Sequence, residues 1–241
     1  IITKESIRNA IKVTMAICGS TNAVLHLSAI ANEAELGMDV VREFKELNKT
    51  TPQIAKVNPA AKWDMEDFYK AGGIPRVMGR LGDILDTSLI TCTGKTVKEN
   101  IEEYKFAYPE NPEIIKTVED PFSATGGVAV LEGNLAPNTA ISKPGAIDPA
   151  LHRFVGKARC FDSEESAEEA ILGGVIQPGE VVVIRYEGPK GGPGMREMFK
   201  AMKFMYGAGL SKSCALITDG RFSGTNNGCF VGHISPEAAE G

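Results

Sequence analysis

The sequence lacks a dense block of basic residues, and its 241 residues carry a formal net charge of -5. Proteins that bind nucleic acid usually carry a basic patch or stripe, so we expect no nucleic-acid partner. Aromatic residues are also sparse, with one tryptophan and five tyrosines, which argues against stacking platforms for single strands. There is no apolar run of membrane-spanning length and no signal peptide, so we expect no membrane association.

The five cysteines show no pattern of a metal-binding or disulfide framework. They form no CxxC pair and no cluster with ligand spacing, so the favoured interpretation is that each is a small buried apolar residue. Scattered free thiols suit a reducing cytoplasm better than an oxidising compartment, and a cytoplasmic protein is expected. The chain begins at Ile1 without an initiating methionine, which predicts a piece of a longer polypeptide.

The first third of the chain is predicted to be helical. Thr3 is expected to cap a helix, because Ser6 and apolar residues at helical spacing follow it. Ser20 or Thr21 is expected to cap a second helix over residues 23–36, which is apolar nearly all round and is therefore predicted to be buried. Further helices are expected at residues 39–49, at 64–85 with a glycine-proline interruption, and at 96–104 with Thr96 as its cap.

The composition changes near residues 106–121, where three prolines predict a linker or domain boundary. Beyond it, strands are expected at residues 126–137, 157–161, 180–186, 214–218 and 228–234. Two helices are expected between them, one capped by Ser163 and one starting near Met195. The sequence thus predicts α/β and β structure: a mainly helical part over residues 1–118, then a β-rich domain with a few helices over residues 119–241.

A loop rich in glycine and proline, RYEGPKGGPGMREMF, is the first candidate site. It is predicted to join a strand that ends at Tyr186 to the helix that starts near Met195. Glycines let backbone N–H groups approach an anion, and a helix start adds the positive end of its dipole. Glu197 would lie in the first turn of that helix, where it either compensates the dipole or binds Mg²⁺, and the residues alone favour the first role.

The closing segment, TDGRFSGTNNG, is the second candidate site. Ser223 and Thr225 flank Gly224, so both hydroxyl groups can converge on one small volume, and Asp219 and Arg221 are expected to pair and brace the turn. A serine hydroxyl acts as a base only when something lowers its pKa, and no histidine lies within the segment. A divalent cation is the expected activator, and a turn in which the hydroxyl groups bond their own backbone is the alternative.

A third polar cluster, GSTNA, stands at the start of the predicted buried helix. Ser20, Thr21 and Asn22 offer hydroxyl, amide and N–H donors at a helix N-terminus, where a substrate carboxylate could be held. Ordinary helix capping explains the same residues equally well. Together with Gly224 and Thr225, these three residues are the candidate substrate-binding groups.

Four segments together resemble one known family. GSTNAVLHLSAIANEA, GNLAP, RYEGPKGGPGMREM and TDGRFSG with GHISPEAAEG are similar, in order and spacing, to motifs of the dihydroxy-acid dehydratase and phosphogluconate dehydratase family. The resemblance runs from Ile1 to Gly241, and the ending is more similar to the dihydroxy-acid dehydratases of branched-chain amino-acid biosynthesis than to the sugar-acid members. Cys18 stands where the family often has glycine, and a slightly altered turn is expected there.

The resemblance implies roles and cofactors. Ser223 matches the serine proposed as proton acceptor in the family, and Glu197 matches a magnesium ligand. An iron–sulfur cluster, [2Fe-2S] or [4Fe-4S], is implied as Lewis acid on the departing hydroxyl group. Its cysteine ligands, and further magnesium ligands including a modified lysine, belong to an amino-terminal region whose motifs are not in this sequence.

The implied activity is that of a hydro-lyase that dehydrates a small 2,3-dihydroxy carboxylic acid to a 2-keto acid. Mg²⁺ would hold the carboxylate and the C2 oxygen, and Ser223 would remove the C2 proton. The resemblance also implies that the chain holds the end of an α/β domain and most of a β-barrel-like swivelling domain, truncated at its end. Such a fragment is expected to be inactive alone, and the full-length protein to be a homodimer or homotetramer.

Two other functions remain open at this stage. The first is a sugar-acid dehydratase of the same family, acting on an aldonate or a phosphogluconate. The second is a non-catalytic module that binds a carboxylate or another anion through its two glycine-rich loops.

Overall fold

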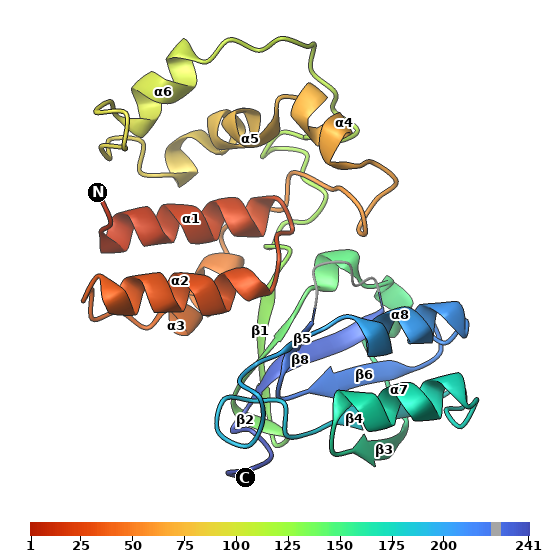
Figure 1. Cartoon of the computed structure of the whole chain (residues 1–241). Coiled ribbons are helices and arrows are strands. Elements are labelled where there is room, and N and C mark those ends of the chain that lie inside the picture. The colour runs from red at the N-terminus through yellow and green to blue at the C-terminus, as the bar shows by residue number, and fades with distance from the viewer. Residues whose placement is uncertain (223–227) are drawn as a thin grey trace. The chain divides into compact units, whose positions relative to one another are not determined.

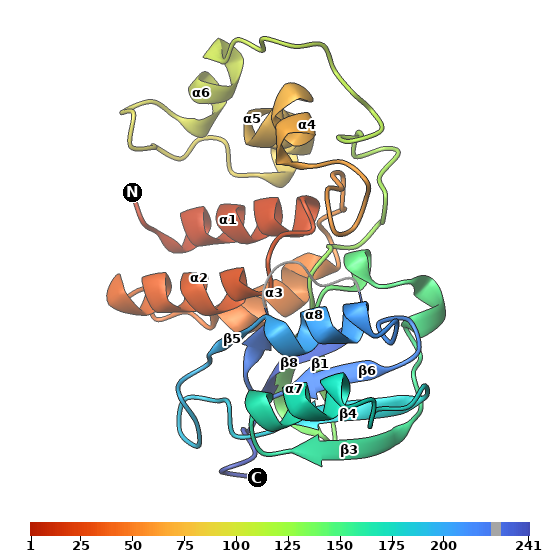
Figure 2. The same ribbon diagram turned by 45° about the vertical axis from the view of Figure 1, so that its right-hand side comes forward.

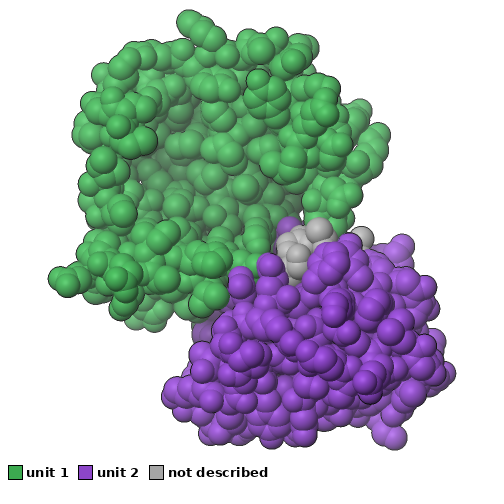
Figure 3. All heavy atoms as spheres, viewed as in Figure 1, with its two compact units in different colours: residues 1–128 green, residues 129–241 purple. Residues whose placement is uncertain are grey.

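The computed structural model describes residues 1–222 and 228–241 (Figures 1 and 2). The chain divides after Val128 into unit 1, residues 1–128, and unit 2, residues 129–241 (Figure 3). Unit 1 is built mainly from helices, and unit 2 from a mixed β-sheet with helices packed on it. The α/β character predicted from the sequence is therefore confirmed. Within the described ranges no helix is both long and apolar enough to cross a membrane.

Unit 1 contains six α-helices whose starts follow local signals in the sequence. They are α1 (Lys4–Ala16), α2 (Asn22–Glu33), α3 (Val40–Asn48), α4 (Met65–Lys70), α5 (Gly73–Leu81) and α6 (Val97–Glu103), with a 3₁₀ turn at Gly82–Ile84. Thr3 and Thr96 both cap their helices as predicted, each within a reciprocal capping box. The glycine pair that was expected to interrupt the middle helix separates α4 from α5.

Helix α2 is less buried than its composition predicted. Only Asn22, Val24 and Ala31 are buried along it, and Ile30 is 42% exposed. The helix packs against α1 and α3 along one side. The prediction of a fully buried helix is therefore wrong for unit 1, because the apolar residues turned away from α1 and α3 have no covering element within this unit.

The proline-rich segment at residues 106–121 belongs in part to the core of unit 1. Ile114 and Ile115 are 1% and 4% exposed and pack in a cluster that includes Ile54. The N–H group of Lys116 donates to the carbonyl oxygen of Ile54 at 2.8 Å, so backbone bonding also fixes this segment. A segment held in this way is not a free linker.

Unit 2 is organised around a six-stranded mixed sheet. Its strands are β1 (Ala129–Gly133), β2 (Ala136–Ser142), β3 (Lys157–Phe161), β4 (Glu180–Ile184), β6 (Ala215–Thr218) and β8 (Cys229–Ser235), in the order β1-β2-β8-β6-β4-β3. The last four strands of that order run parallel, whereas β2 pairs antiparallel with both β8 and β1. Short 3₁₀ helices at Pro144–Ala146 and Pro149–Leu151 connect β2 to β3.

Helices α7 (Glu164–Leu172) and α8 (Lys200–Gly207) cover one face of this sheet (Figures 1 and 2). Val182 and Ile184 of β4 point into the core beneath these helices. Leu216 of β6 lies opposite Val182 in register, Phe230 of β8 lies opposite Leu216, and both belong to the same core. Met205 of α8 is fully buried among them. Ser163 caps α7 as predicted, accepting a hydrogen bond from the N–H group of residue 166.

The described sheet is open, with β1 and β3 as its edge strands. A closed barrel would require these two edges to pair with each other or with further strands. The barrel-like closure implied by the resemblance is not seen among residues 129–222 and 228–241.

The cysteines differ in burial more than predicted. Cys18 and Cys214 are buried as expected, whereas Cys92 and Cys160 are exposed. Cys160 lies on the edge strand β3, which leaves its side chain uncovered. Cys18 has a φ of +50°, in the left-handed region that favours glycine, which agrees with the glycine that the family often has there.

Candidate functional site

Glu197 lies beside the segment that leads into Ser223. Two-residue strands β5 (Glu197–Met198) and β7 (Arg221–Phe222) pair in parallel, with Glu197 opposite Arg221 and Met198 opposite Phe222. Met198 and Phe222 are both buried, whereas Glu197 is exposed. Because successive side chains on a strand point to opposite faces, Glu197 and Arg221 share the face turned away from the core.

The helix predicted to start near Met195 begins later than expected. Helix α8 starts at Lys200, and Glu197 lies in β5 instead of a first helical turn. The prediction failed because pairing with β7 fixes an extended backbone where local propensity favours a helix. Glu197 therefore does not lie in the first helical turn, where the dipole-compensating role was predicted.

The glycine-rich loop already holds a carboxylate, and it belongs to the protein. Glu237, 7% exposed, accepts hydrogen bonds from the N–H groups of Lys190, at 2.9 and 3.0 Å, and of Gly191, at 2.7 Å. A Cβ atom on Gly188 would lie 2.6 Å from Glu237 Oε2, so the close approach requires glycine there. The anion-binding capacity predicted for these N–H groups is real, but an internal side chain uses it.

A second buried carboxylate fixes the start of the same loop. Asp219, 5% exposed, accepts hydrogen bonds from the N–H groups of Tyr186, Glu187 and Ala238, each at 3.0 Å. Its two oxygens thereby join the end of strand β4 to the chain that follows β8. Asp219 thus braces the turn, as predicted, but through backbone N–H groups.

Arg221 does not form the pair with Asp219 that was predicted. Its Nε atom donates to the carbonyl oxygen of Met195 at 2.6 Å, while Asp219 bonds to backbone N–H groups. The N–H group of Met195 in turn donates to the carbonyl oxygen of Glu187 at 2.9 Å. The turn is braced, but by side-chain to backbone bonds instead of an ion pair.

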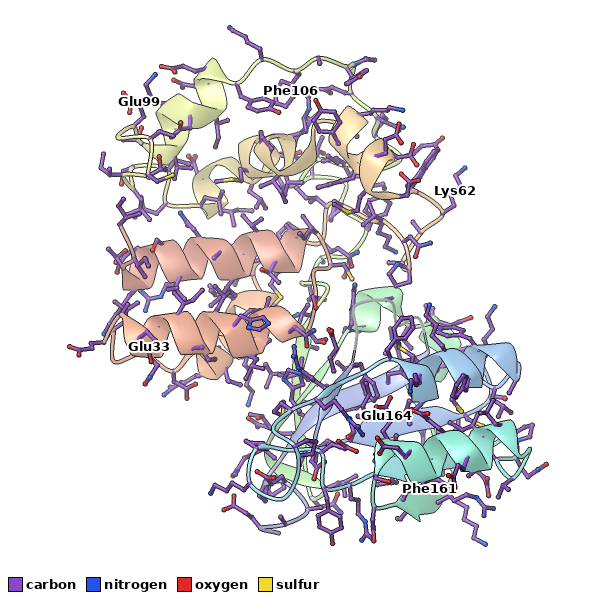
Figure 4. All side chains as sticks on the ribbon, viewed as in Figure 1. Glu33, Lys62, Glu99, Phe106, Phe161 and Glu164 are labelled. Atoms are coloured by element: carbon purple, nitrogen blue, oxygen red, sulfur yellow. The ribbon has the colours of Figure 1, made fainter. Side chains whose placement is uncertain are left out.

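Arg196, the residue directly before Glu197, is bonded to helix α7. It donates to Glu165 at 2.6 and 3.1 Å and to the buried Glu187 at 2.8 Å. The hydrogen bond from Arg196 lowers the pKa of Glu165 to about 2. Glu164, at the start of α7 (Figure 4), is 5% exposed, and burial raises the pKa of its carboxyl group.

His233 is a polar residue that was not among the predicted site residues. It lies in β8 with a φ of +53°, and its N–H group donates to the carbonyl oxygen of Gly220 at 2.8 Å. Burial, reinforced by the nearby charge of Arg221, lowers the pKa of His233 to about 4. The imidazole is therefore held neutral, and its residue is bonded to the segment just before β7. The sequence signal for this residue is its place in the GHIS motif.

Ser223, Gly224 and Thr225 lie outside the described residues. The predictions that Ser223 is the base, and that the other two bind substrate, therefore stay predictions. Ser223 follows Phe222 directly in the chain, so a single peptide bond links it to strand β7.

Ser20, Thr21 and Asn22 lie in unit 1, at the start of α2. Thr21 stands at the N-cap position but makes no side-chain capping bond, and Ser20 Oγ accepts from the N–H group of Asn22 at 3.2 Å. Thr21 and Asn22 are 7% and 8% exposed. The role of these three residues in binding substrate stays a prediction.

The described residues offer one carboxylate suited to Mg²⁺, and they do not fit an iron–sulfur cluster. Mg²⁺ is usually bound through one or two protein carboxylates and keeps waters and substrate oxygens, so exposed Glu197 is suited to be one ligand. An iron–sulfur cluster needs several cysteine thiolates close together. Among residues 1–222 and 228–241, no group of three or more histidine, cysteine, aspartate or glutamate side chains is arranged to hold a metal.

Fold and site define a two-part α/β chain whose β-rich part displays the carboxylate of Glu197 beside strand β7. The family model described as dihydroxy-acid/6-phosphogluconate dehydratase C-terminal matches residues 113–241, and its N-terminal counterpart matches residues 1–100. The chain therefore belongs to the dihydroxy-acid/6-phosphogluconate dehydratase family. The resemblance found in the sequence is thereby confirmed.

Several similar proteins are named dihydroxy-acid dehydratase. Those of Caldanaerobacter subterraneus subsp. tengcongensis, Moorella thermoacetica and Methanosarcina barkeri are 50%, 51% and 50% identical to this chain over its whole length. The match covers 43–44% of the length of these relatives. The chain thus spans less than half the length of the proteins it resembles.

Proposed function

We propose that this chain is part of a dihydroxy-acid dehydratase, a hydro-lyase that converts a 2,3-dihydroxy carboxylic acid to a 2-keto acid in branched-chain amino-acid biosynthesis. The observation that supports this most is the pairing of β5 with β7, which brings exposed Glu197 next to the strand that runs into Ser223. A magnesium ligand and a proton acceptor are the two groups that the family motifs assign to these positions.

In the proposed reaction, Ser223 Oγ takes the proton from C2 of the substrate. The electron pair left at C2 forms the C2–C3 double bond as the C3 hydroxyl group departs and, with a proton, becomes water. The resulting enol gains a proton at C3 and loses one from the C2 oxygen, which gives the 2-keto acid. Glu197 would hold Mg²⁺, which when bound supplies positive charge that acidifies the C2 proton and favours the serine alkoxide.

Further parts of the reaction belong to the rest of the protein. The described cysteines do not fit the iron–sulfur cluster of the family, so its ligands and the assistance to the departing C3 hydroxyl group come from elsewhere in the complete enzyme. We infer that residues 1–241 alone are inactive. A cytoplasmic homodimer or homotetramer is the proposed form of the complete enzyme.

The proposal also carries the domain assignment made from the sequence. Residues 1–118 would complete an α/β domain, and residues 119–241 would form most of a β-barrel-like swivelling domain. The mixed six-stranded sheet of unit 2 supports the second part, since its two free edges can take up further strands.

A sugar-acid dehydratase is the second candidate, because the family description also names 6-phosphogluconate dehydratase. The names of the similar proteins favour a dihydroxy acid. Comparing turnover of a branched dihydroxy acid with turnover of gluconate and 6-phosphogluconate by the complete enzyme decides between them. A non-catalytic anion-binding module is disfavoured, because Glu237 already occupies the N–H groups that would bind the anion.

The test of the proposed function is Ser223→Ala in the complete enzyme. Turnover should be abolished while the cluster absorbance stays that of the wild type. Ser213→Ala, whose hydroxyl group donates only a long bond to a backbone carbonyl at 3.4 Å in the same unit, is the matched control and should retain turnover. A Ser223→Ala enzyme that still turns over, or that loses the cluster, would contradict the role proposed for Ser223.

A further inference from the structure

We propose that Glu237 is a positioning residue of the metal site: its carboxylate orders the glycine-rich loop that leads into Glu197. The loop is accordingly a scaffold for that ligand, and its N–H groups do not receive the carboxylate of the substrate. The inference rests on the proposed function, because it takes Glu197 as a magnesium ligand.

The first step is the seat of Glu237 in the loop. Both of its carboxylate oxygens accept from the N–H group of Lys190, Oε2 also accepts from the N–H group of Gly191, and the side chain is almost completely buried. Bonds from backbone N–H groups to a buried carboxylate are charge-assisted and stronger than bonds between neutral groups. A Cβ atom on Gly191 would come within 2.2 Å of Ala239 Cβ, so this glycine too is needed for the close fit.

The second step connects the loop to Glu197. Past residue 191 the chain folds back, and the N–H groups of Gly194 and Met195 donate to the carbonyl oxygens of Gly188 and Glu187 at 3.2 and 2.9 Å. Arg221 then holds the carbonyl oxygen of Met195 from the side of β7. These bonds join the two ends of the loop just before β5. The position of the loop backbone therefore determines the position of Glu197.

The third step concerns charge. The ammonium group of Lys190, on the same loop, pairs with the carboxylate of Glu240. With Glu237 on the N–H groups and Glu240 on the ammonium group, the donors of this part of the loop face carboxylates of the protein itself. An incoming substrate carboxylate would have to displace Glu237 and would be repelled by it, because like charges disfavour each other at short range.

The test is Glu237→Gln in the complete holoenzyme, with Mn²⁺ as the probe in place of Mg²⁺. An amide keeps the size of the side chain but removes the charge and turns one acceptor into a donor that faces N–H groups. Residues that orient a metal ligand typically change metal affinity by roughly 10- to 100-fold when replaced, and Mn²⁺ binding measured by electron paramagnetic resonance should weaken by that factor. Amide hydrogen exchange over residues 188–195 should become faster, with the cluster absorbance unchanged.

Glu240→Gln is the matched control, because it makes the same chemical change three residues further on. Its side chain is 43% exposed and pairs with the side chain of Lys190, so Mn²⁺ affinity should stay within about twofold of the wild type. Glu237→Asp, which keeps the charge on a shorter side chain, should give an intermediate affinity and serves if Glu237→Gln fails to fold. Wild-type Mn²⁺ affinity and wild-type amide exchange in whichever of the two variants folds would overturn the inference.

A failure of the proposed function would look different. Glu197→Gln with wild-type Mn²⁺ affinity would refute the ligand role of Glu197, and the amide exchange of the Glu237 variants would still show whether the carboxylate orders the loop.

Discussion

Glu197 and Arg221 lie opposite each other in the register of two short parallel strands, on the face turned away from the core of unit 2. The strand that carries Arg221 ends at Phe222, and Ser223 is the next residue of the chain. Residues that are far apart in sequence, one in a glycine-rich loop and one in the closing motif, are therefore held together by backbone pairing.

Glu197→Gln should abolish the activation of turnover by Mg²⁺ in the complete enzyme and leave its stability nearly unchanged. The side chain is exposed, and substitutions of exposed side chains usually change the free energy of unfolding by less than about 0.5 kcal/mol. A Mg²⁺ titration of activity, together with thermal unfolding, makes the measurement. Glu169→Gln on α7, also exposed, is the control, and a Glu197→Gln enzyme with normal Mg²⁺ activation would count against the assignment.

Arg196→Ala should destabilise unit 2 by about 3 kcal/mol or more, because it leaves the buried Glu187 without its cation. The pKa of Glu165 should rise, because the hydrogen bond from Arg196 is the main cause of its lowering. Urea unfolding measures the first effect. Arg185→Ala is the control, because its partner Asp162 is 65% exposed and such pairs contribute at most about 1 kcal/mol. Equal losses in the two variants would show that Arg196 does not act as an anchor.

Elements of the fold that depend on neighbours in the chain could be predicted from the sequence. Helices α1, α6 and α7 are capped by Thr3, Thr96 and Ser163, whose side chains each accept a bond from the N–H group three residues on, and such a signal is local. Strand β4 could be predicted for a similar reason, since its β-branched residues stand between turn-forming residues.

Features of the site that depend on distant parts of the chain could not be predicted. Strand β5 is two residues long and exists because β7 lies beside it, so the helical propensity of its residues misled the prediction. Glu237 bonds to loop residues that are 46 and 47 positions away in the sequence. No spacing rule predicts that the N–H groups of a glycine-rich loop will bind a carboxylate of the same protein. Glu197 and Glu237 both lie in the family motifs, but the motifs do not indicate the strand pairing of the first or the hydrogen bonds of the second.

The stability of the protein should fall as the pH drops from about 6.5 to about 4 because of His233. Its pKa in the folded chain is lowered to about 4, so in this range the unfolded imidazole binds a proton that the folded one does not. Above pH 6.5 the imidazole is neutral in both states and costs no stability. As the pH falls to 4, the free energy of unfolding decreases by about 2–3 kcal/mol. His233→Asn, which tolerates the positive φ, should flatten the dependence of unfolding free energy on pH in this window.

The matching control for that measurement is His152→Asn, which makes the same chemical change at an exposed histidine. Parallel slopes for the wild type and His233→Asn between pH 6 and 4.5 would show that the His233 imidazole is not held neutral by the fold.

Gly192→Ala should destabilise the glycine-rich loop more than any exposed substitution nearby. A Cβ atom there would lie 2.0 Å from the carbonyl oxygen of Tyr186, and backbone cannot yield as a flexible side chain can, so a loss of about 3 kcal/mol is expected. Gly207→Ala, at the last residue of α8 with open space around its Cβ position, should instead gain about 0.5–1 kcal/mol. Urea midpoints of the two variants test both signs at once. If Gly192→Ala unfolds at the wild-type midpoint, the close contact between Gly192 and the backbone of Tyr186 is wrong. The loop conformation that places Glu197 in β5 would then be wrong as well.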